Sequence, residues 1–205
     1  MSAHAQAERR DESRAWWLRS LVVAQAPRAV FAALRDDSRA GAEDRQEPVA
    51  TIAFLVGVAL TLASSASASF ADDPARGGIV IPVWLFVSGV FVGLVNYWLG
   101  GGVSYRQARH LLALAAVPLA LSLALLPVRL ALYGDDIFRS GGSDAGTGAH
   151  VFTALEACFA FWALALLVVG VRALTSWGWP RSLVAVGAFA ALLAGADLAL
   201  SVLGR

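Results

Sequence analysis

Long apolar runs separated by short polar segments dominate the last three quarters of the chain. The five runs cover residues 49–69, 79–99, 111–128, 151–171 and 182–203. Because a helix rises about 1.5 Å per residue, each run is close to the length that crosses a hydrocarbon core of about 30 Å. The pattern therefore predicts an all-α, polytopic integral membrane protein built as a bundle of five transmembrane helices at residues 49–205.

The segment before these runs mixes apolar and basic residues. Residues 1–12 are polar and are expected to be a disordered tail, and residues 13–48 are expected to lie in the cytoplasm. Pro27 would break a single helix, so two short helices are predicted, followed by a charged linker at Asp36–Pro48. An amphipathic segment that carries Trp and Arg suits the membrane interface. The residues assigned to that interface are Trp16, Trp17, Arg14 and Arg19. The same apolar stripe could instead pack on the cytoplasmic face of the bundle, and both alternatives stay open.

Two sequence features affect what is expected of the first and the third predicted span. The first run ends in ASSASASF, which resembles a signal-peptidase site, but it starts after 48 residues and a secretory signal totals only about 15–30. An uncleaved span is therefore expected. The third run contains Pro118, which should kink its helix, since proline is tolerated in a span when neighbouring groups satisfy the freed carbonyl.

The distribution of arginine sets the orientation. With a cytoplasmic N-terminus, twelve of the sixteen arginines lie in inner segments and four in outer ones. The positive-inside rule therefore places the N-terminus in the cytoplasm and the C-terminus outside. Every basic residue is Arg, and Ala and Gly are abundant, which favours a GC-rich bacterial genome. The expected location is the bacterial cytoplasmic membrane.

Composition argues against several function classes. The chain is 58% hydrophobic and 15% charged, whereas soluble domains have about 45–50% and about 25%. A net charge of +1 speaks against nucleic-acid binding, which needs a basic face. His110 and His150 fall on opposite sides of the predicted membrane, so they cannot share a metal. No catalytic, cofactor-binding or metal site is predicted, and an enzyme is not expected.

Polar residues inside the predicted spans give one candidate site. Glu156, Asp197 and Arg129 should lie at similar depth in the outer leaflet, near serines that end the first span. A charged side chain that faces lipid is expensive, so these groups should face inward and pair. The candidate intramembrane polar cluster comprises Glu156, Asp197, Arg129, Ser64 and Ser67. It could line a small outward-facing cavity for an ion, a proton or a lipid head group, or it could simply hold the bundle together.

The second span carries a helix-packing signal. Gly89 and Gly93 form a GxxxG pattern, which allows close approach of two helices, and Asn96 can hydrogen-bond across such a contact.

Three stretches resemble the bacterial branch of the Yip1 family. They are NYWLGGGVSYRQARHLLALAAVPLALSLAL (96–125), FWALALLVVGVRALTSWGWPRSLVAV (161–186) and APRAVFAALRDD (26–37). The resemblance implies five spans, a cytoplasmic N-terminus and a short outer C-terminus. Eukaryotic members of the family bind prenylated small GTPases and sort transport membranes. Their DLYGP-type sequence before the spans is missing here, which puts GTPase binding in doubt.

The expected function is that of a non-enzymatic Yip1-like membrane scaffold, which acts through protein–protein and membrane-interface contacts. Its expected partners are the lipid bilayer and other membrane proteins or a second copy. The alternative is a small transporter or channel subunit that uses Glu156 and Asp197. A structure that shows these carboxylates either paired or lining a cavity would separate the two.

Overall fold

Every regular element in the described part of the chain is a helix. The computed structural model describes residues 15–63, 87–134, 137 and 146–203. A helix at residues 15–22 comes first, and α2 (Pro27–Ala33) starts at the proline that was expected to divide this segment. The prediction of two short helices is therefore confirmed. Proline is favourable at a helix start because its missing N–H has no partner there in any case.

The next helix, α3 (Arg39–Ala63), begins earlier than expected. Residues 39–48, predicted as a charged linker, form its first turns. Ser38 stabilises this start, because its side-chain oxygen accepts a hydrogen bond from the Gly41 N–H at 3.1 Å. Arg39 and Glu43 add an ion pair at 3.0 Å across one turn. Local capping and helix-forming residues outweigh the high charge that favoured a linker.

The helix at residues 87–92 continues as η2, a π-helix (Gly93–Trp98), and ends in a glycine-rich loop. Gly100 and Gly102 have φ of +66° and +63°, values that side chains other than glycine rarely adopt. Between them, a Cβ on Gly101 would overlap the Val95 side chain. Three consecutive glycines thus let the chain fold back closely on η2.

The next helix is long but interrupted. It comprises α6 (Tyr105–Ala115), α7 (Val117–Leu121), the short 3₁₀ helix η3 (Ser122–Ala124) and α8 (Leu125–Tyr133). The first break, at Ala116, comes two residues before Pro118. The sequence predicted a kink here, because proline clashes with the preceding turn and lacks an N–H. After these come α9 (Thr147–Thr175) and α10 (Trp179–Leu203).

Two helices among the described residues, Tyr105–Tyr133 and Thr147–Thr175, are long and apolar enough to cross a membrane. Shorter apolar helices occur at Val87–Asn96 and Trp179–Gly195. Of the expected first span, 49–69, residues 49–63 are described and lie in α3.

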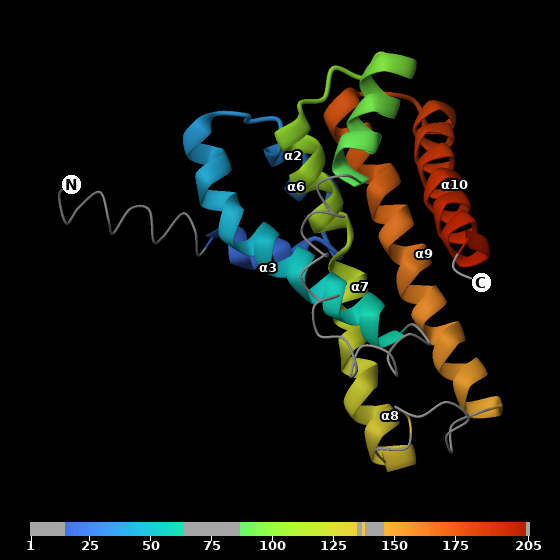
Figure 1. Ribbon diagram of the computed structural model, residues 1–205. Coiled ribbons are helices and arrows are strands. Elements are labelled where there is room, and N and C mark those ends of the chain that lie inside the picture. Colours follow the sequence, from blue (N-terminus) through green and yellow to red (C-terminus); the bar gives the residue numbers. More distant parts are fainter. Residues whose placement is uncertain (1–14, 64–86, 135–136, 138–145, 204–205) are drawn as a thin grey trace.

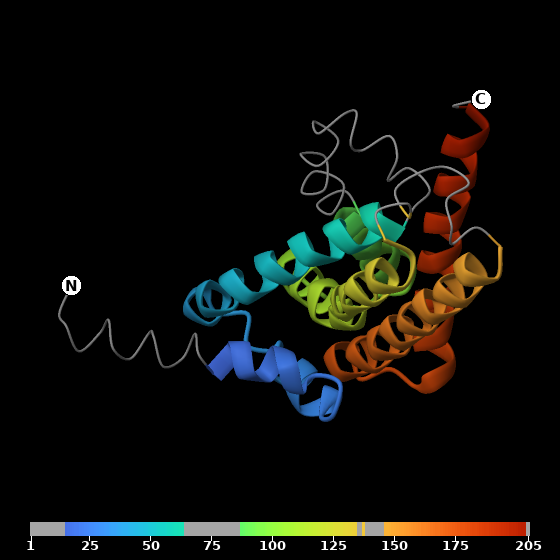
Figure 2. The same cartoon turned by 90° about the horizontal axis from the view of Figure 1, so that it is seen from below.

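The helices form an elongated bundle in which α9 packs against α2, α6, α7 and α10, while α3 crosses α6 and α7 obliquely (Figures 1 and 2). We call the end that contains α2, the start of α6 and the junction between α9 and α10 the α2 end. The opposite end, with the end of α8 and the start of α9, is the α8 end. The hydrophobic core lies toward the α2 end, where Phe31, Leu34 and Leu111 are fully buried. Within the described part of the chain, α8 has no buried residue.

Candidate functional site

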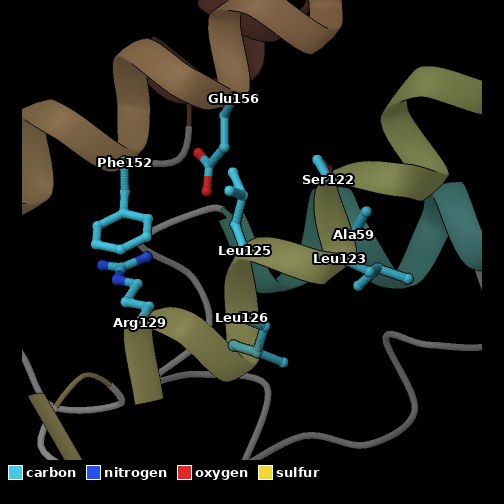
Figure 3. A pocket seen from close by; sticks show the side chains of 8 residues that line it. All are labelled: Ala59, Ser122, Leu123, Leu125, Leu126, Arg129, Phe152 and Glu156. Carbon is cyan, nitrogen blue, oxygen red and sulfur yellow. The ribbon is translucent and has the colours of Figure 1, made fainter. Parts of the chain in front are cut away.

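A small cavity lies where the interrupted helix meets α3 and α9 (Figure 3). Its polar lining consists of Ser122, Arg129 and Glu156. The remaining lining residues are Ala59, Leu123, Leu125, Leu126 and Phe152. The cavity therefore lies beside the second break in the helix, at η3, and not beside a regular turn.

Two features of the sequence produce this break. Pro127 has no N–H to offer the carbonyl of Leu123 four residues earlier. Ser122 bends the chain further, because its hydroxyl donates to the Leu119 carbonyl at 2.7 Å, an interaction that often bends helices. A short 3₁₀ stretch within a helix often marks a hinge or a functional site, and here Ser122 and Leu123 of this stretch line the cavity.

Glu156 and Arg129, assigned to one polar cluster from their inferred depth, line this same cavity. The Glu156 carboxyl group points from α9 toward the α8 side, and the Arg129 guanidinium lies beside the Phe152 ring (Figure 3). The guanidinium carbon is 5.7 Å from the centre of that ring, within the range of a cation–π interaction. A positive and a negative group thus face one space from two helices.

The other predicted members of the cluster remain predictions. Ser64 and Ser67 lie outside the described residues. The backbone of Asp197 lies in α10, but its side chain is not among the described ones. Ala59 contributes α3 to the cavity wall, so the helix that contains residues 49–63 of the expected first span reaches this site.

A second polar site lies at the α2 end and was not predicted. Arg45 is 1% exposed and donates to the backbone oxygens of Ala33 at 3.3 Å and Asp36 at 2.7 Å. Gln107 of α6 donates to the carbonyl of Leu34 at 3.2 Å. These side chains satisfy carbonyls at the C-terminal end of α2 that have no partner within the helix.

Arg35, which follows α2, binds the C-terminal end of α9 through two hydrogen bonds. Its Nε donates to the Ala173 carbonyl at 2.8 Å, and Nη2 donates to the Ser176 hydroxyl at 3.3 Å. We call the contacts of Arg35, Arg45 and Gln107 the α2 clamp. One signal in the sequence pointed here: Ser104 and Gln107 form a reciprocal capping box at the start of α6, a pattern recognisable from Ser and Gln three residues apart.

The residues assigned to the membrane interface separate into two groups. Trp16 is 7% exposed, and its ring centre lies 4.8 Å from the Arg19 guanidinium carbon and 5.2 Å from that of Arg45. Trp17 is half-buried and Arg19 is exposed, while Arg14 lies outside the described residues. The ring of Trp16 therefore faces protein, and the outward face of this helix is formed by Leu18, Leu21 and Val22.

The expected helix-packing residues of the second span have different surroundings. A Cβ on Gly93 would meet no described atom within 4 Å, and one on Gly89 would reach only the Tyr105 ring at 4.0 Å. Asn96 instead binds the loop that follows its own helix: its side-chain oxygen accepts from the Val103 N–H at 2.7 Å, and its amide group donates to the Val103 carbonyl. In this chain Asn96 closes a loop.

The described residues contain no group of three or more His, Cys, Asp or Glu side chains that could hold a metal ion. A family model for the Yip1 domain matches residues 21–199. No curated protein and no solved structure matches the chain. The match to this family and the two long apolar helices support a membrane protein.

Proposed function

The chain belongs to the Yip1 family, and from this premise we propose that it is a non-enzymatic integral membrane scaffold. In this proposal five helices, at residues 49–69, 79–99, 111–128, 151–171 and 182–203, cross the cytoplasmic membrane of a bacterium. The N-terminus lies in the cytoplasm and the C-terminus outside. The scaffold acts through contacts of its cytoplasmic face with the membrane interface and with other membrane proteins.

One observation carries this proposal: the helix at residues 15–22 is held on the bundle but keeps an apolar face outward. Trp16 and Val23 anchor it, at 7% and 0% exposure, while Leu18 and Leu21 are 57% and 69% exposed. The helix runs across the long axis of the bundle (Figures 1 and 2). A helix that lies crosswise on a membrane bundle, with Arg19 beside exposed leucines, matches the physical requirements of an interfacial helix.

The arginines support the orientation. Arg35 contacts Ala173, and Arg172 and Arg181 stack on Trp179 and Trp177 with their guanidinium carbons 3.9 and 4.4 Å from the ring centres. These residues, together with Arg45 of the α2 clamp, gather at the α2 end. Arginine near the cytoplasmic surface is favoured by anionic lipid head groups, and tryptophan is enriched at membrane interfaces. The α2 end is therefore the cytoplasmic end in this proposal.

Depth-dependent fluorescence quenching tests the interfacial role in the full-length protein. Cys158 is replaced by Ser, and a fluorophore is attached to a new cysteine at Leu21 or, as the control, at Arg39, whose side chain is 91% exposed. In lipid nanodiscs a quencher attached near the head groups should quench the probe at residue 21 strongly and the probe at residue 39 weakly. Equal quenching at both positions would contradict the interfacial contact.

The transport alternative has its own test. Protein reconstituted into liposomes should produce no ion or proton flux above empty liposomes if it is a scaffold. A flux that disappears in the Glu156→Gln variant would replace the scaffold proposal by that of a small transporter or channel subunit.

A further inference from the structure

Three arginines meet at the turn that joins α9 to α10. The first is Arg35, which donates from Nε to the Ala173 carbonyl and from Nη2 to the Ser176 hydroxyl. Ser176 ends α9 in the left-handed conformation, with φ of 59°, which is uncommon for residues other than glycine. A cation that lies 138 residues before Ala173 in the chain is therefore attached directly to this turn.

The other two arginines come from α9 and α10 themselves. Arg172 donates from Nε to the Trp177 carbonyl at 3.3 Å, and its guanidinium carbon lies 3.9 Å from the centre of the Trp179 ring. Arg181 donates to the Leu99 carbonyl, and its guanidinium carbon lies 4.4 Å from the centre of the Trp177 ring. Each side chain is therefore oriented by one hydrogen bond and one aromatic ring, and both contact Trp177.

These contacts leave most donors of the three guanidinium groups unused. A guanidinium has five N–H donors; the printed bonds of Arg35 use two, and those of Arg172 and Arg181 use one each. A ring contact takes up a face of the planar group and not its N–H edge. Among the residues that the structure describes, no carboxylate pairs with any of the three arginines. The positive charge at this turn therefore has no acidic counterpart there, and the turn suits an anion.

The surface next to the turn indicates a lipid as the source of that anion. Trp179, Leu183 and Val184 of α10 are 48%, 55% and 61% exposed. Leu183 follows Trp179 by four residues and Val184 follows Arg181 by three, so each lies one helical turn beyond its partner on the same face. Acyl chains can cover these side chains, whereas a soluble anion would leave them exposed. Tryptophan beside the charges is also typical of the membrane interface.

We propose that the turn at residues 173–179 binds the phosphate group of an anionic phospholipid, whose acyl chains lie along Leu183 and Val184. The phosphate accepts hydrogen bonds from Arg172 and Arg181, because a planar guanidinium matches the geometry of phosphate oxygens, and Arg35 adds positive charge. A zwitterionic head group would bring its own cation into this positive field, so it should bind more weakly. The inference rests on the proposed membrane insertion and names a defined lipid site at the α2 end.

Thermal unfolding of the full-length protein in a neutral detergent tests the selectivity. Phosphatidylglycerol and phosphatidylcholine with identical acyl chains are titrated separately. We expect phosphatidylglycerol to raise the Tm with saturation, since a ligand that binds only the folded state stabilises it, and phosphatidylcholine to raise it much less. Equal shifts with both lipids would overturn the proposal. Inorganic phosphate at the same concentration should give a much smaller shift; a shift as large as that of phosphatidylglycerol would overturn the lipid as the source.

Variants then locate the effect. Arg172→Gln combined with Arg181→Gln should weaken the response to phosphatidylglycerol about tenfold or more, because charge-assisted hydrogen bonds are lost. Arg28→Gln removes the same charge from an exposed position on α2 and is the matched control, which should respond as the original protein does. A full response in the folded double variant, or an equal loss in the control, would overturn the proposal. If the double variant does not fold, the two single variants replace it, and a full response in both would have the same meaning.

Failure of this proposal can be distinguished from failure of the proposed function. Binding in detergent does not depend on the orientation of the chain in a membrane or on the number of spans. Loss of lipid selectivity would leave the quenching result at residue 21 unaffected. Equal quenching at residues 21 and 39 would contradict the interfacial helix and would leave the response to phosphatidylglycerol unchanged.

Discussion

Gly170 of α9 lies directly against Phe31 of α2. A Cβ on residue 170 would lie 3.3 Å from two ring carbons of Phe31 and would overlap the Leu111 side chain of α6. Since Phe31 and Leu111 are both fully buried, neither can move aside without opening the core. Three helices that are distant in sequence therefore meet at one glycine, and α2 reaches the bundle only because that residue has no side chain.

Replacing Gly170 should consequently weaken the attachment of α2. Gly170→Ala is expected to destabilise the protein by about 1–3 kcal/mol through overpacking. Gly187→Ala, where a Cβ would meet no described atom within 4 Å, should be neutral or slightly stabilising, because alanine is the better helix former. Thermal unfolding in detergent measures both. Equal effects of the two substitutions would show that the contact between α2, α6 and α9 contributes nothing.

Arg45 should matter more for the N-terminal segment than its neighbour Arg39 on the same helix. Arg45→Ala removes the hydrogen bonds to Ala33 and Asp36, and bonds to a charged group contribute about 1.5–3 kcal/mol each. Arg39→Ala removes only an exposed pair with Glu43, which contributes a few tenths of a kcal/mol. Limited proteolysis should therefore cleave the N-terminal segment of the Arg45 variant much faster. Similar cleavage of both variants would refute a role for the α2 clamp.

Asn96 should control the glycine-rich loop. Asn96→Ala leaves the N–H and C=O of Val103 without their side-chain partner, and the expected loss is about 1–3 kcal/mol. Amide hydrogen exchange at Val103 should accelerate in this variant. The amide of Gln107, which is bonded to Ser104 at 3.1 Å, serves as the internal control and should exchange as before. Unchanged protection at Val103 would mean that the loop is held by other contacts.

Asp36 should titrate below the usual range of an aspartate. Its pKa is lowered from 3.8, first by the hydrogen bond from the Ser38 backbone N–H and then by one from the Ser38 side chain. Because the folded-state pKa is depressed, the stability that Asp36 contributes is present above pH 3.8 and is lost as the pH falls through the lower folded value. In an NMR titration, Ser38→Ala should move the Asp36 midpoint upward toward 3.8. An unchanged midpoint would assign the whole shift to the backbone.

Reporter fusions test the proposed topology. A reporter after Arg205 should report an outer location, and reporters at Met1 or within residues 101–109 should report the cytoplasm, because arginine is concentrated in the segments assigned to the inside. A cytoplasmic C-terminus would contradict the count of five spans.

Much of the helical organisation followed from local properties of the chain. Pro27 divides the N-terminal segment and Pro118 interrupts the third apolar run, as expected, because proline acts on the turn that contains it and needs no tertiary partner. The family, too, was recognisable from three short stretches and is confirmed by the match over residues 21–199. The predicted charged linker at Asp36–Pro48 was wrong for residues 39–48. Its high charge favoured a linker, but capping by Ser38 starts α3 at Arg39.

The sequence alone therefore determined the pattern of apolar positions, the interruptions of helices at proline and the family membership. Each of these depends on neighbouring residues or on residue identity. Only the tertiary structure decided that Trp16 faces Arg45, that Asn96 binds Val103, and that Glu156 and Arg129 share a cavity with Ser122. An amphipathic stripe predicts that one face of a helix is buried, but it does not predict which surface of the protein covers that face. That choice depends on shape at single positions such as Gly170, where the absence of one Cβ lets α2 pack on the bundle.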